Sequence, residues 1–237
     1  MQVYKLIYTK LNNLIKHISF DLWLTLIKSH PDFKLMRAKF LKKEFNPFGY
    51  SARAIMEIVQ NTDKVSDRLN EITGKKVATE LMYRRILVGL GYNPKTINDD
   101  LIQPIQSEVN KMFLNYPPLF LNDFIEPMLQ DLVNRGYSIN ISSNTGYIEG
   151  KIIRETLRNL NVLGHFKFLV FSDEINISKP STGFFEKVQE QSGFEKEEIL
   201  HVGDNIKADY NGATKYGFKA YHINNNQYTI NDITRHL

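Results

Sequence analysis

Five polar residues stand where short hydrophobic segments of the chain end, and their types suit one kind of chemistry. Asp21 follows the segment HISF, and Ser143 ends a segment that begins at residue 137. Lys179 comes several residues after a third segment, Asp204 follows Gly203 at the end of a fourth, and Asp209 stands five residues beyond Asp204. Together they supply carboxylates, a hydroxyl and a lysine, an inventory that suits phosphoryl transfer.

Each of these side chains has a role that follows from its chemistry. A hard cation such as Mg²⁺ binds one or two carboxylates together with water and substrate oxygens, and Asp21 and Asp204 suit that purpose. A carboxylate also acts as a nucleophile and forms an aspartyl-phosphate. Charge develops on the phosphoryl oxygens during transfer, so a lysine and a hydroxyl placed beside them lower the barrier. Lys179 and Ser143 have the types that these positions need.

The segments that position these residues alternate between strand and helix from residue 123 on. Apolar patterns predict strands over residues 137–143, 167–171, 199–202 and 218–223, separated by helices over residues 124–135, 148–160, 183–191 and 206–216. Such alternation predicts a parallel sheet covered on both faces, to which the first strand, residues 17–21, also belongs. Ligands bind beyond the carboxyl ends of such strands, so the five polar residues are expected at one edge of the sheet.

The middle of the chain has a different pattern. Residues 32–115 show helical spacing of apolar side chains, with breakers at residues 47–49, at Gly74 and at residues 91–94. We therefore expect an α/β fold with a doubly wound, Rossmann-like core and an inserted all-helical domain. The core would comprise residues 1–27 and 123–237, with residues 1–16 as an N-terminal extension, and the inserted domain would comprise residues 28–122.

Composition and charge limit the function classes. Of the 237 residues 42% are hydrophobic and 24% are charged, as in ordinary globular proteins, and we expect no membrane-spanning segment. Cysteine is absent, which excludes disulfides and thiolate zinc sites and suits a cytoplasmic protein. Residues 28–122 hold 15 Lys or Arg against 10 Asp or Glu, within a net charge of +4. Because no dense basic run occurs, a small anionic ligand is favoured over nucleic acid.

Four ordered motifs, FDLWLT, ISSN, SKPS and HVGDNIKAD, resemble those of the haloacid dehalogenase superfamily. The resemblance covers residues 17–27 and 123–223 and implies a helical cap inserted after the first motif, where residues 28–122 lie. It also implies roles: Asp21 as the nucleophile, Asp204 as a magnesium ligand and Asp209 as a support of the metal site.

The same resemblance assigns the remaining motif residues. Ser143 and Lys179 would bind the phosphoryl group, and Thr25 would brace the nucleophile loop beside the substrate. Asn144 is a further candidate for substrate binding and Asn205 for metal binding, although both also suit a plain turn or helix cap.

One position departs from the pattern of the family's phosphatases. These enzymes usually carry a second Asp two residues after the nucleophile, which protonates the leaving group and then activates water, whereas this chain has Trp23. The family uses the backbone carbonyl at this position for the metal, and Trp23 keeps it. We therefore expect Mg²⁺ binding to survive and acid–base help, worth roughly 10²–10⁴-fold, to be lost. The loss weighs most on poor leaving groups such as sugar alkoxides, and less on acyl and aryl phosphates.

Three functions remain open at this point. The first is hydrolysis of small phosphorylated metabolites through an aspartyl-phosphate, with Mg²⁺ as cofactor. The second is 2-haloacid dehalogenation, because the family's dehalogenases also lack the second Asp and carry an aromatic residue there. These dehalogenases resemble SSN at the fourth motif and need no metal, whereas Gly203-Asp204-Asn205 matches the magnesium-binding form. The third is a catalytically weak or inactive binding protein on the same fold.

Several residues have a structural interpretation beside the functional one. Trp23 suits either a wall of the substrate pocket or the core. Arg37 belongs to a basic cluster that is typical of a solvated helix face, the alternative being a cap that holds a substrate anion; the cluster comprises Lys34, Arg37, Lys39, Lys42 and Lys43. His17 and His201 lie inside expected strands and are interpreted as structural. We expect a monomer or a homodimer.

Overall fold

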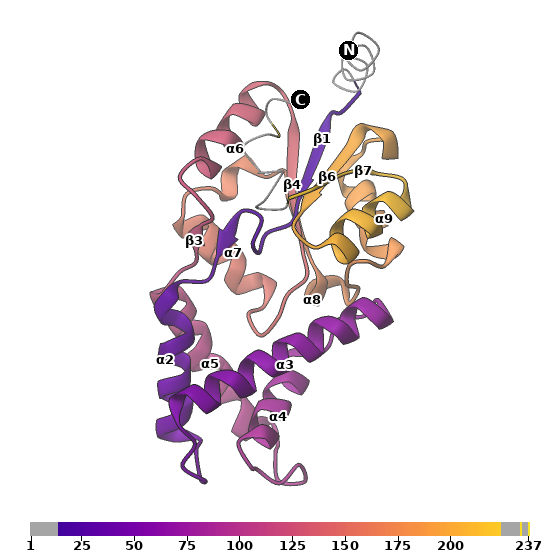
Figure 1. Ribbon diagram of the computed structural model, residues 1–237. Coiled ribbons are helices and arrows are strands. Elements are labelled where there is room, and N and C mark those ends of the chain that lie inside the picture. The colour runs from indigo at the N-terminus through magenta and orange to yellow at the C-terminus, as the bar shows by residue number, and fades with distance from the viewer. Residues whose placement is uncertain (1–13, 224–232, 234–236) are drawn as a thin grey trace.

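The computed structural model describes residues 14–223 together with residues 233 and 237. Figure 1 shows a sheet flanked by helices and, below it, a separate group of helices. This lower group comes from one continuous stretch of chain between β1 and β4. Of the predicted N-terminal extension, residues 1–13 lie outside the described part of the chain.

A five-stranded parallel sheet forms the centre of the upper part. Its order is β5-β4-β1-β6-β7, and the strands are His17–Phe20 (β1), Ser138–Ser143 (β4), Phe168–Phe171 (β5), Ile199–Gly203 (β6) and Lys219–His222 (β7). The register pairs Ile18 with Ile139 on one side and with Leu200 on the other. All four residues of β1 are buried, because a central parallel strand is covered on both faces. The predicted α/β fold with a doubly wound parallel sheet is confirmed.

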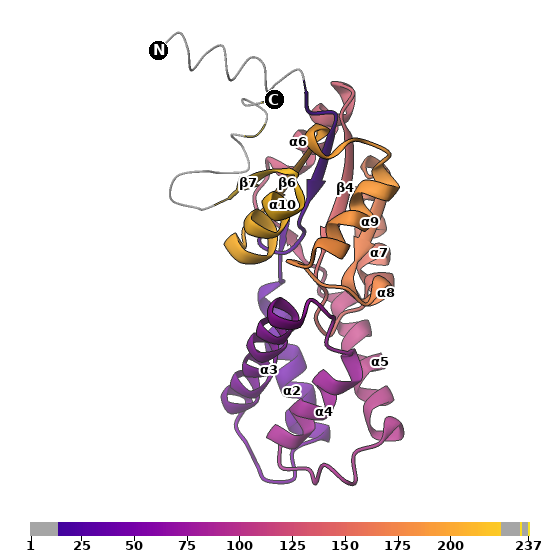
Figure 2. The same ribbon diagram turned by 90° about the vertical axis from the view of Figure 1, so that its right-hand side faces the viewer.

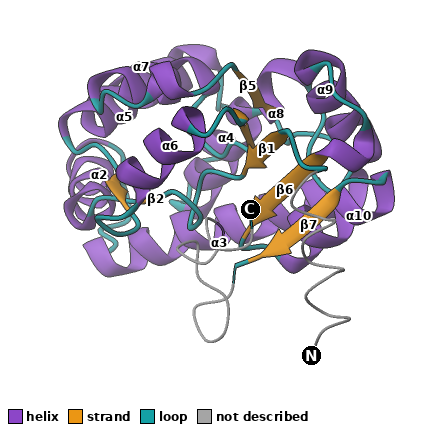
Figure 3. Ribbon diagram, turned by 90° about the horizontal axis from the view of Figure 1, so that it is seen from above, coloured by secondary structure: helices purple, strands orange, loops and turns teal. Residues whose placement is uncertain are grey.

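Helices cover both faces of the sheet, as the view from above shows (Figure 3). One layer contains Ile125–Asn134 (α6) and Gly150–Asn159 (α7), and the opposite layer contains Thr182–Ser192 (α9) and Gly212–Tyr216 (α10). Each layer buries an apolar stripe: Met128 and Leu132 of α6 belong to one core cluster, and Phe185 and Val188 of α9 belong to another. The helices α6, α7 and α9 agree with the sequence-based expectation to within a few residues.

Four helices make up the inserted part, which we call the cap. They are Pro31–Glu44 (α2), Ala52–Thr73 (α3), Thr79–Gly89 (α4) and Asp99–Asn115 (α5). Ser51 caps the start of α3, and Gly74, one of the predicted breakers, ends it with a φ of 67° that favours glycine. Two short antiparallel strands, Ile27–Lys28 (β2) and Leu119–Phe120 (β3), pair where the chain enters and leaves the cap.

The structure departs from the expectation in its shortest elements. The strands β2 and β3 and the four-residue helix Ser172–Ile175 (α8) are too short to show an apolar period. The single helix expected over residues 206–216 is wrong, because a π-helical turn, Ile206–Asn211 (η3), precedes α10. The carbonyl of Asn205 accepts from the backbone N–H groups of both Asp209 and Tyr210, which widens this first turn.

The cap lies against the edge of the sheet where the strands end. Figure 2 shows α3 running beneath this edge. The backbone N–H of Ser178 donates to the carbonyl of Gly74 at 2.9 Å, and the hydroxyl of Tyr147 donates to the carbonyl of Val59 at 2.6 Å. These bonds tie the C-terminal end of α3 and a point within its first half to loops of the core. No helix within the described residues is long and apolar enough to cross a membrane.

Candidate active site

Asp21 lies directly beyond the carboxyl end of the central strand β1. Its backbone N–H donates to the carbonyl of Val202 in β6 at 2.8 Å, which continues the sheet by one bond. One carboxylate oxygen, Oδ2, accepts from the hydroxyl of Thr25 at 3.2 Å, and the other, Oδ1, lies 2.7 Å from the Nζ of Lys179. Only 7% of Asp21 is exposed. The two contacts therefore fix the orientation of the carboxylate, and its exposed part faces a single cavity.

Lys179 links Asp21 and Asp209, which follow different strands of the sheet. Its Nζ donates to Asp21 Oδ1 at 2.7 Å, to Asp209 Oδ1 at 2.6 Å and to the carbonyl of Ser142 at 2.6 Å. An ammonium group has three N–H bonds, and all three are used. Asn144 holds the backbone of the lysine: its Oδ1 accepts from Lys179 N at 2.8 Å and its Nδ2 donates to Lys179 O at 3.0 Å.

The remaining acidic residues come from the loop after β6. Asp204 is half-buried, and Asp209 is buried inside the π-helical turn. Asp209 accepts from the backbone N–H of Asn205 at 3.0 Å, and His201 Nε2 lies 3.2 Å from its Oδ1. Gly203 lies so close to the Asp209 carboxylate that a side chain at position 203 would overlap it. The wide turn thus brings Asp209 back to the end of the strand it follows.

Burial and neighbouring charges raise the pKa values of two of these acids and lower that of the third. Burial raises the pKa of Asp21 to about 7 against the opposing charge of Lys179, and burial with the nearby Asp209 charge raises the pKa of Asp204 to about 6. Burial also acts to raise the pKa of Asp209, but Lys179 and His201 outweigh it and hold that pKa below its usual range. Three carboxylates in one place thus repel one another, and a single lysine offsets only part of the charge.

These groups fit a divalent cation. Carboxylate oxygens of Asp21, Asp204 and Asp209 lie within 4.8 Å of one another, and an all-oxygen set suits Mg²⁺. The carbonyl of Trp23 accepts no hydrogen bond within the described residues, so it is free to join them. The side-chain oxygen of Asn205 is less suited, because it already accepts from the backbone N–H groups of Lys207 and Ala208.

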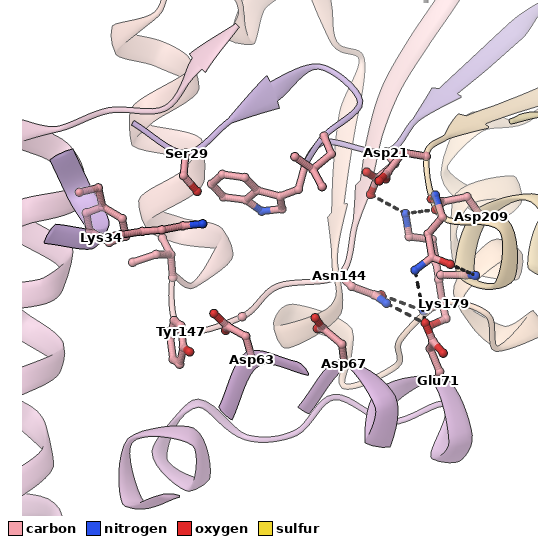
Figure 4. Close-up of a pocket in the computed structure, with 18 of the residues that line it drawn as sticks. Asp21, Ser29, Lys34, Asp63, Asp67, Glu71, Asn144, Tyr147, Lys179 and Asp209 are labelled. Atoms are coloured by element: carbon pink, nitrogen blue, oxygen red, sulfur yellow. Dashed lines mark hydrogen bonds and ion pairs between the residues drawn. The ribbon is translucent and has the colours of Figure 1, made fainter. Parts of the chain in front are cut away.

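The acids open into a cavity of about 330 Å³ that lies between the sheet edge and the cap. Asp21, Lys179 and Asp209 line the core side, and helices α2 and α3 contribute the cap side, as Figure 4 shows. Asp204 lines the core side as well. The Nδ2 of Asn205 donates to Glu71 of α3 at 3.3 Å, which joins the two sides. The cavity is thus a cleft between core and cap that is partly open to solvent, with the nucleophile candidate at one end.

Trp23 lines this cavity and also packs against the core. Its ring meets Phe113 of α5 edge to face, with the ring centroids 6.1 Å apart. Both interpretations of Trp23 therefore apply at once. The position expected to hold a second acid–base carboxylate carries an aromatic wall.

Ser143 and Thr25 lie behind the cavity wall. Both side chains are fully buried and neither lines the cavity. The hydroxyl of Ser143 donates to the carbonyl of Asn144 at 3.3 Å. Thr25 contacts Asp21, as a brace would, whereas the role of Ser143 toward a phosphoryl group stays a prediction.

The basic cluster of α2 divides into two parts. Lys39, Lys42 and Lys43 are exposed, as a solvated face predicts. That interpretation is wrong for Arg37, which is only 8% exposed and lines the cavity. Its guanidinium lies 5.1 Å from the ring centroid of Phe33 and 4.8 Å from that of Tyr147.

The acidic side of the cap was not predicted from the sequence. Asp63, Asp67 and Glu71 of α3 all line the cavity. Residues four apart lie on one face of a helix, so their spacing was a usable signal. The spacing alone could not identify the site, because nothing in the sequence indicated which face of α3 meets the core.

The two strand histidines are buried, as their structural interpretation requires. His201 Nδ1 lies 3.1 Å from Ser19 Oγ, and His17 Nε2 lies 2.8 Å from Asn140 Oδ1. Burial lowers the pKa of His17 to about 4 and also lowers that of His201. Both rings therefore act as neutral hydrogen-bonding partners inside the sheet.

The family model described as haloacid dehalogenase-like hydrolase matches residues 18–223. The glyceraldehyde 3-phosphate phosphatase of Methanothermobacter thermautotrophicus is 33% identical over 98 residues, covering 40% of this chain and 41% of that protein. The phospholysine phosphohistidine inorganic pyrophosphate phosphatase of Xenopus laevis is 29% identical over 164 residues, covering 65% and 58%. The chain spans between 28% and 58% of the length of the curated relatives it matches.

Solved structures share the fold. The magnesium-bound hydrolase YfnB from Bacillus subtilis has a TM-score of 0.73 at 14% identity, covering 93% of this chain and 97% of that one. A 2-haloacid dehalogenase from Pseudomonas syringae has a TM-score of 0.60 at 17% identity, covering 94% and 97%. At such identities the likeness concerns the fold alone.

Proposed function

Since the chain belongs to the family of haloacid dehalogenase-like hydrolases, we propose that it hydrolyses small phosphorylated metabolites with the help of Mg²⁺. The observation that carries this proposal is the meeting of Asp21, Lys179, Asp204 and Asp209 at the bottom of one cavity. The proposed substrates are phosphate esters or acyl phosphates. Curated relatives named as phosphatases support this class of substrate.

The proposed reaction has two steps at Asp21. A carboxylate oxygen attacks phosphorus in line, the bond from phosphorus to the leaving oxygen breaks, and that oxygen takes a proton from water. Water then attacks the aspartyl-phosphate, which releases inorganic phosphate and restores the carboxylate. The hydrogen bond from Thr25 and the ion pair with Lys179 keep Asp21 aimed during both steps.

The other residues stabilise charge. Asp21, Asp204, Asp209 and the carbonyl of Trp23 would hold Mg²⁺, which supplies positive charge opposite the phosphoryl oxygens when bound. Lys179 and Ser143 are proposed to hold the phosphoryl group. Asn144 keeps Lys179 in place through its two backbone bonds.

Trp23 defines which phosphates suit this enzyme. Without a carboxylate at position 23, the leaving group departs without a proton from the protein at that position. A leaving group that is already a weak base, such as a carboxylate or a phenolate, loses little. We therefore propose a preference for acyl and aryl phosphates over alkyl phosphates.

A second candidate function, 2-haloacid dehalogenation, is favoured by one observation. An aromatic residue, Trp23, lines the cavity where a phosphatase of this family would place an acid. The close set of three carboxylates speaks for a metal and so for the phosphatase. A third possibility, a binding protein without turnover, predicts that Asp21 is dispensable for all it does.

Trapping of the intermediate tests the proposal directly. The protein with Mg²⁺ is mixed with a ³²P-labelled acyl phosphate, quenched in acid and examined for protein-bound label. The proposal predicts label that is released by base and absent from Asp21→Asn.

The expected cytoplasmic location and monomer or homodimer state stay predictions.

A further inference from the structure

The cap end of the cavity carries charges that the proposed hydrolysis does not use. Arg37 and Lys34 of α2 line it together with Asp63 and Asp67 of α3. In Figure 4, Asp63 and Asp67 project from α3 into the space across from Asp21, and Lys34 extends toward the same space. This end of the cavity is thus built from charged groups of both signs.

Arg37 is a buried cation without a hydrogen-bonding partner. It is 8% exposed, yet within the described residues its guanidinium forms no hydrogen bond and no ion pair, only contacts with two aromatic rings. A guanidinium has five N–H donors, and those of Arg37 are not sealed from solvent but reach the cavity that the residue lines. The rings of Phe33 and Tyr147 fix its plane. Such a group is preorganised to bind a carboxylate or phosphate oxygen.

The acids of α3 have polar neighbours, since Asn205 donates to Glu71 and the hydroxyl of Tyr147 contacts Asp63, but they lack ion pairs. None of Asp63, Asp67 and Glu71 forms an ion pair with a basic side chain in the described part of the chain, although Arg37 and Lys34 line the same cavity. Partial burial raises the pKa of Asp67 to about 6, with the charges of Asp63 and Glu71 adding to the shift. Burial raises the pKa of Asp63 as well. Both carboxylates would gain from a cation.

The total charge of the cavity points the same way. Its lining holds six carboxylates and three basic side chains, a formal charge of −3. One Mg²⁺ would reduce this to about −1, and a phosphate dianion would restore it. The head group of an amino acid carries one charge of each sign and leaves this total at −3, whereas a further anionic group without an ammonium would make it more negative.

We propose that the cap end of the cavity binds the head group of an amino acid, its carboxylate at Arg37 and its ammonium at Asp63 and Asp67. This inference rests on the proposed function, because the phosphoryl group would occupy the Asp21 end. The substrate class is therefore a phosphorylated amino acid. Acyl phosphates and aryl phosphates of amino acids also have leaving groups that are weak bases, as the lack of a carboxylate at position 23 requires.

Binding of stable phosphonates to the wild-type protein with Mg²⁺ tests the inference without turnover. The probe is 4-(phosphonomethyl)phenylalanine, compared by calorimetry with its N-acetyl form, its carboxamide and 4-methylbenzylphosphonate, which lacks both charges. A shorter series built on 2-amino-4-phosphonobutyrate covers a different chain length. We expect, in at least one series, about 10-fold weaker binding for each charge removed, as for the loss of a charge-assisted hydrogen bond.

The contradicting result is equally clear. Equal affinity with and without either charge, in both series, overturns the proposal. Phosphate release from phosphotyrosine in the same preparations tests the proposed function separately. Selective binding without phosphate release would contradict hydrolysis and support head-group recognition, and phosphate release without selectivity would do the reverse.

Two variants assign the charges to residues. Arg37→Met keeps the packing between the rings and should remove the preference for the acid over the carboxamide, leaving the carboxamide's affinity unchanged. Asp63→Asn combined with Asp67→Asn should remove the preference for the free amine over the N-acetyl form. Lys43→Met on α2 and Glu57→Gln on α3, both at exposed positions, are the matched controls and should preserve both preferences. Variants that weaken all four ligands equally would contradict the assignment.

Discussion

Asn144 holds the backbone of Lys179 on both sides, accepting from its N–H at 2.8 Å and donating to its carbonyl at 3.0 Å. The two residues are 35 positions apart and follow different strands. A single amide thus fixes the start of the lysine side chain whose other end joins Asp21 to Asp209. The relative position of Asp21 and Asp209 therefore depends on this link between two loops.

Asn144→Ala should therefore reduce activity through the position of Lys179. The substitution leaves two buried backbone groups of Lys179 unpaired, which costs about 1–3 kcal/mol in the free energy of unfolding. We expect kcat to fall at least tenfold, as measured in steady-state assays on an aryl phosphate. Lys207→Ala, at an exposed position that does not line the cavity, is the control for a general effect of substitution. Full activity in Asn144→Ala would contradict the role assigned to Asn144.

Trp23→Asp tests the missing acid. The new carboxyl group would stand where the family's phosphatases usually carry a proton donor, so turnover of alkyl phosphates should rise relative to aryl phosphates, by up to about 10²-fold. Trp23→Phe keeps an aromatic ring against Phe113 without a carboxyl group and should show no such change. An unchanged ratio of alkyl to aryl turnover in Trp23→Asp would show that the account of this position is wrong.

Gly203→Ala tests the close approach between the end of β6 and Asp209. A methyl group at position 203 would overlap the carboxylate of Asp209, so either the turn or the strand must shift. We expect a loss of about 1–3 kcal/mol of stability and a weaker stabilisation by Mg²⁺ in thermal unfolding. Gly164→Ala, where a methyl group meets nothing, is the matched control. Wild-type stabilisation by Mg²⁺ in Gly203→Ala would argue against Asp209 as part of the metal site.

His17 gives the fold a defined dependence on pH. Burial lowers its pKa from 6.5 to about 4, so the folded state resists a proton that the unfolded state accepts. Stability is complete above pH 6.5, falls as the pH drops toward 4, and has then lost about 3 kcal/mol from this group. His17→Gln should lose correspondingly less over this range, as urea unfolding at several pH values would measure. Parallel curves for the variant and the wild type would refute this assignment.

Much of this architecture was readable because its signals are local. The strands β1 and β6 are short and mostly buried, and a carboxylate follows each of them, so Asp21 and Asp204 could be chosen as candidates before their distance was known. The cap helices showed in the apolar spacing and in breakers such as Gly74. Their existence followed from the sequence, and so did their insertion between the first and second motifs.

The rest depends on contacts that no local pattern contains. Arg37 looked like one member of an exposed cluster, because its burial results from the packing of Tyr147, a residue of the core, against its guanidinium. Asp63 and Asp67 gained meaning only once α3 was seen to face the nucleophile. The π-helical turn at Asp209 likewise results from bonds to Asn205 that compete with a regular helix.

The most direct test of the account is phosphate release from acyl, aryl and alkyl phosphates, with Mg²⁺ and with a chelator, for the wild type and Asp21→Asn. The account predicts release that requires Mg²⁺, favours acyl and aryl phosphates, and vanishes in Asp21→Asn. Release that persists in Asp21→Asn, or no release from any of these phosphates by the wild-type protein, would contradict it.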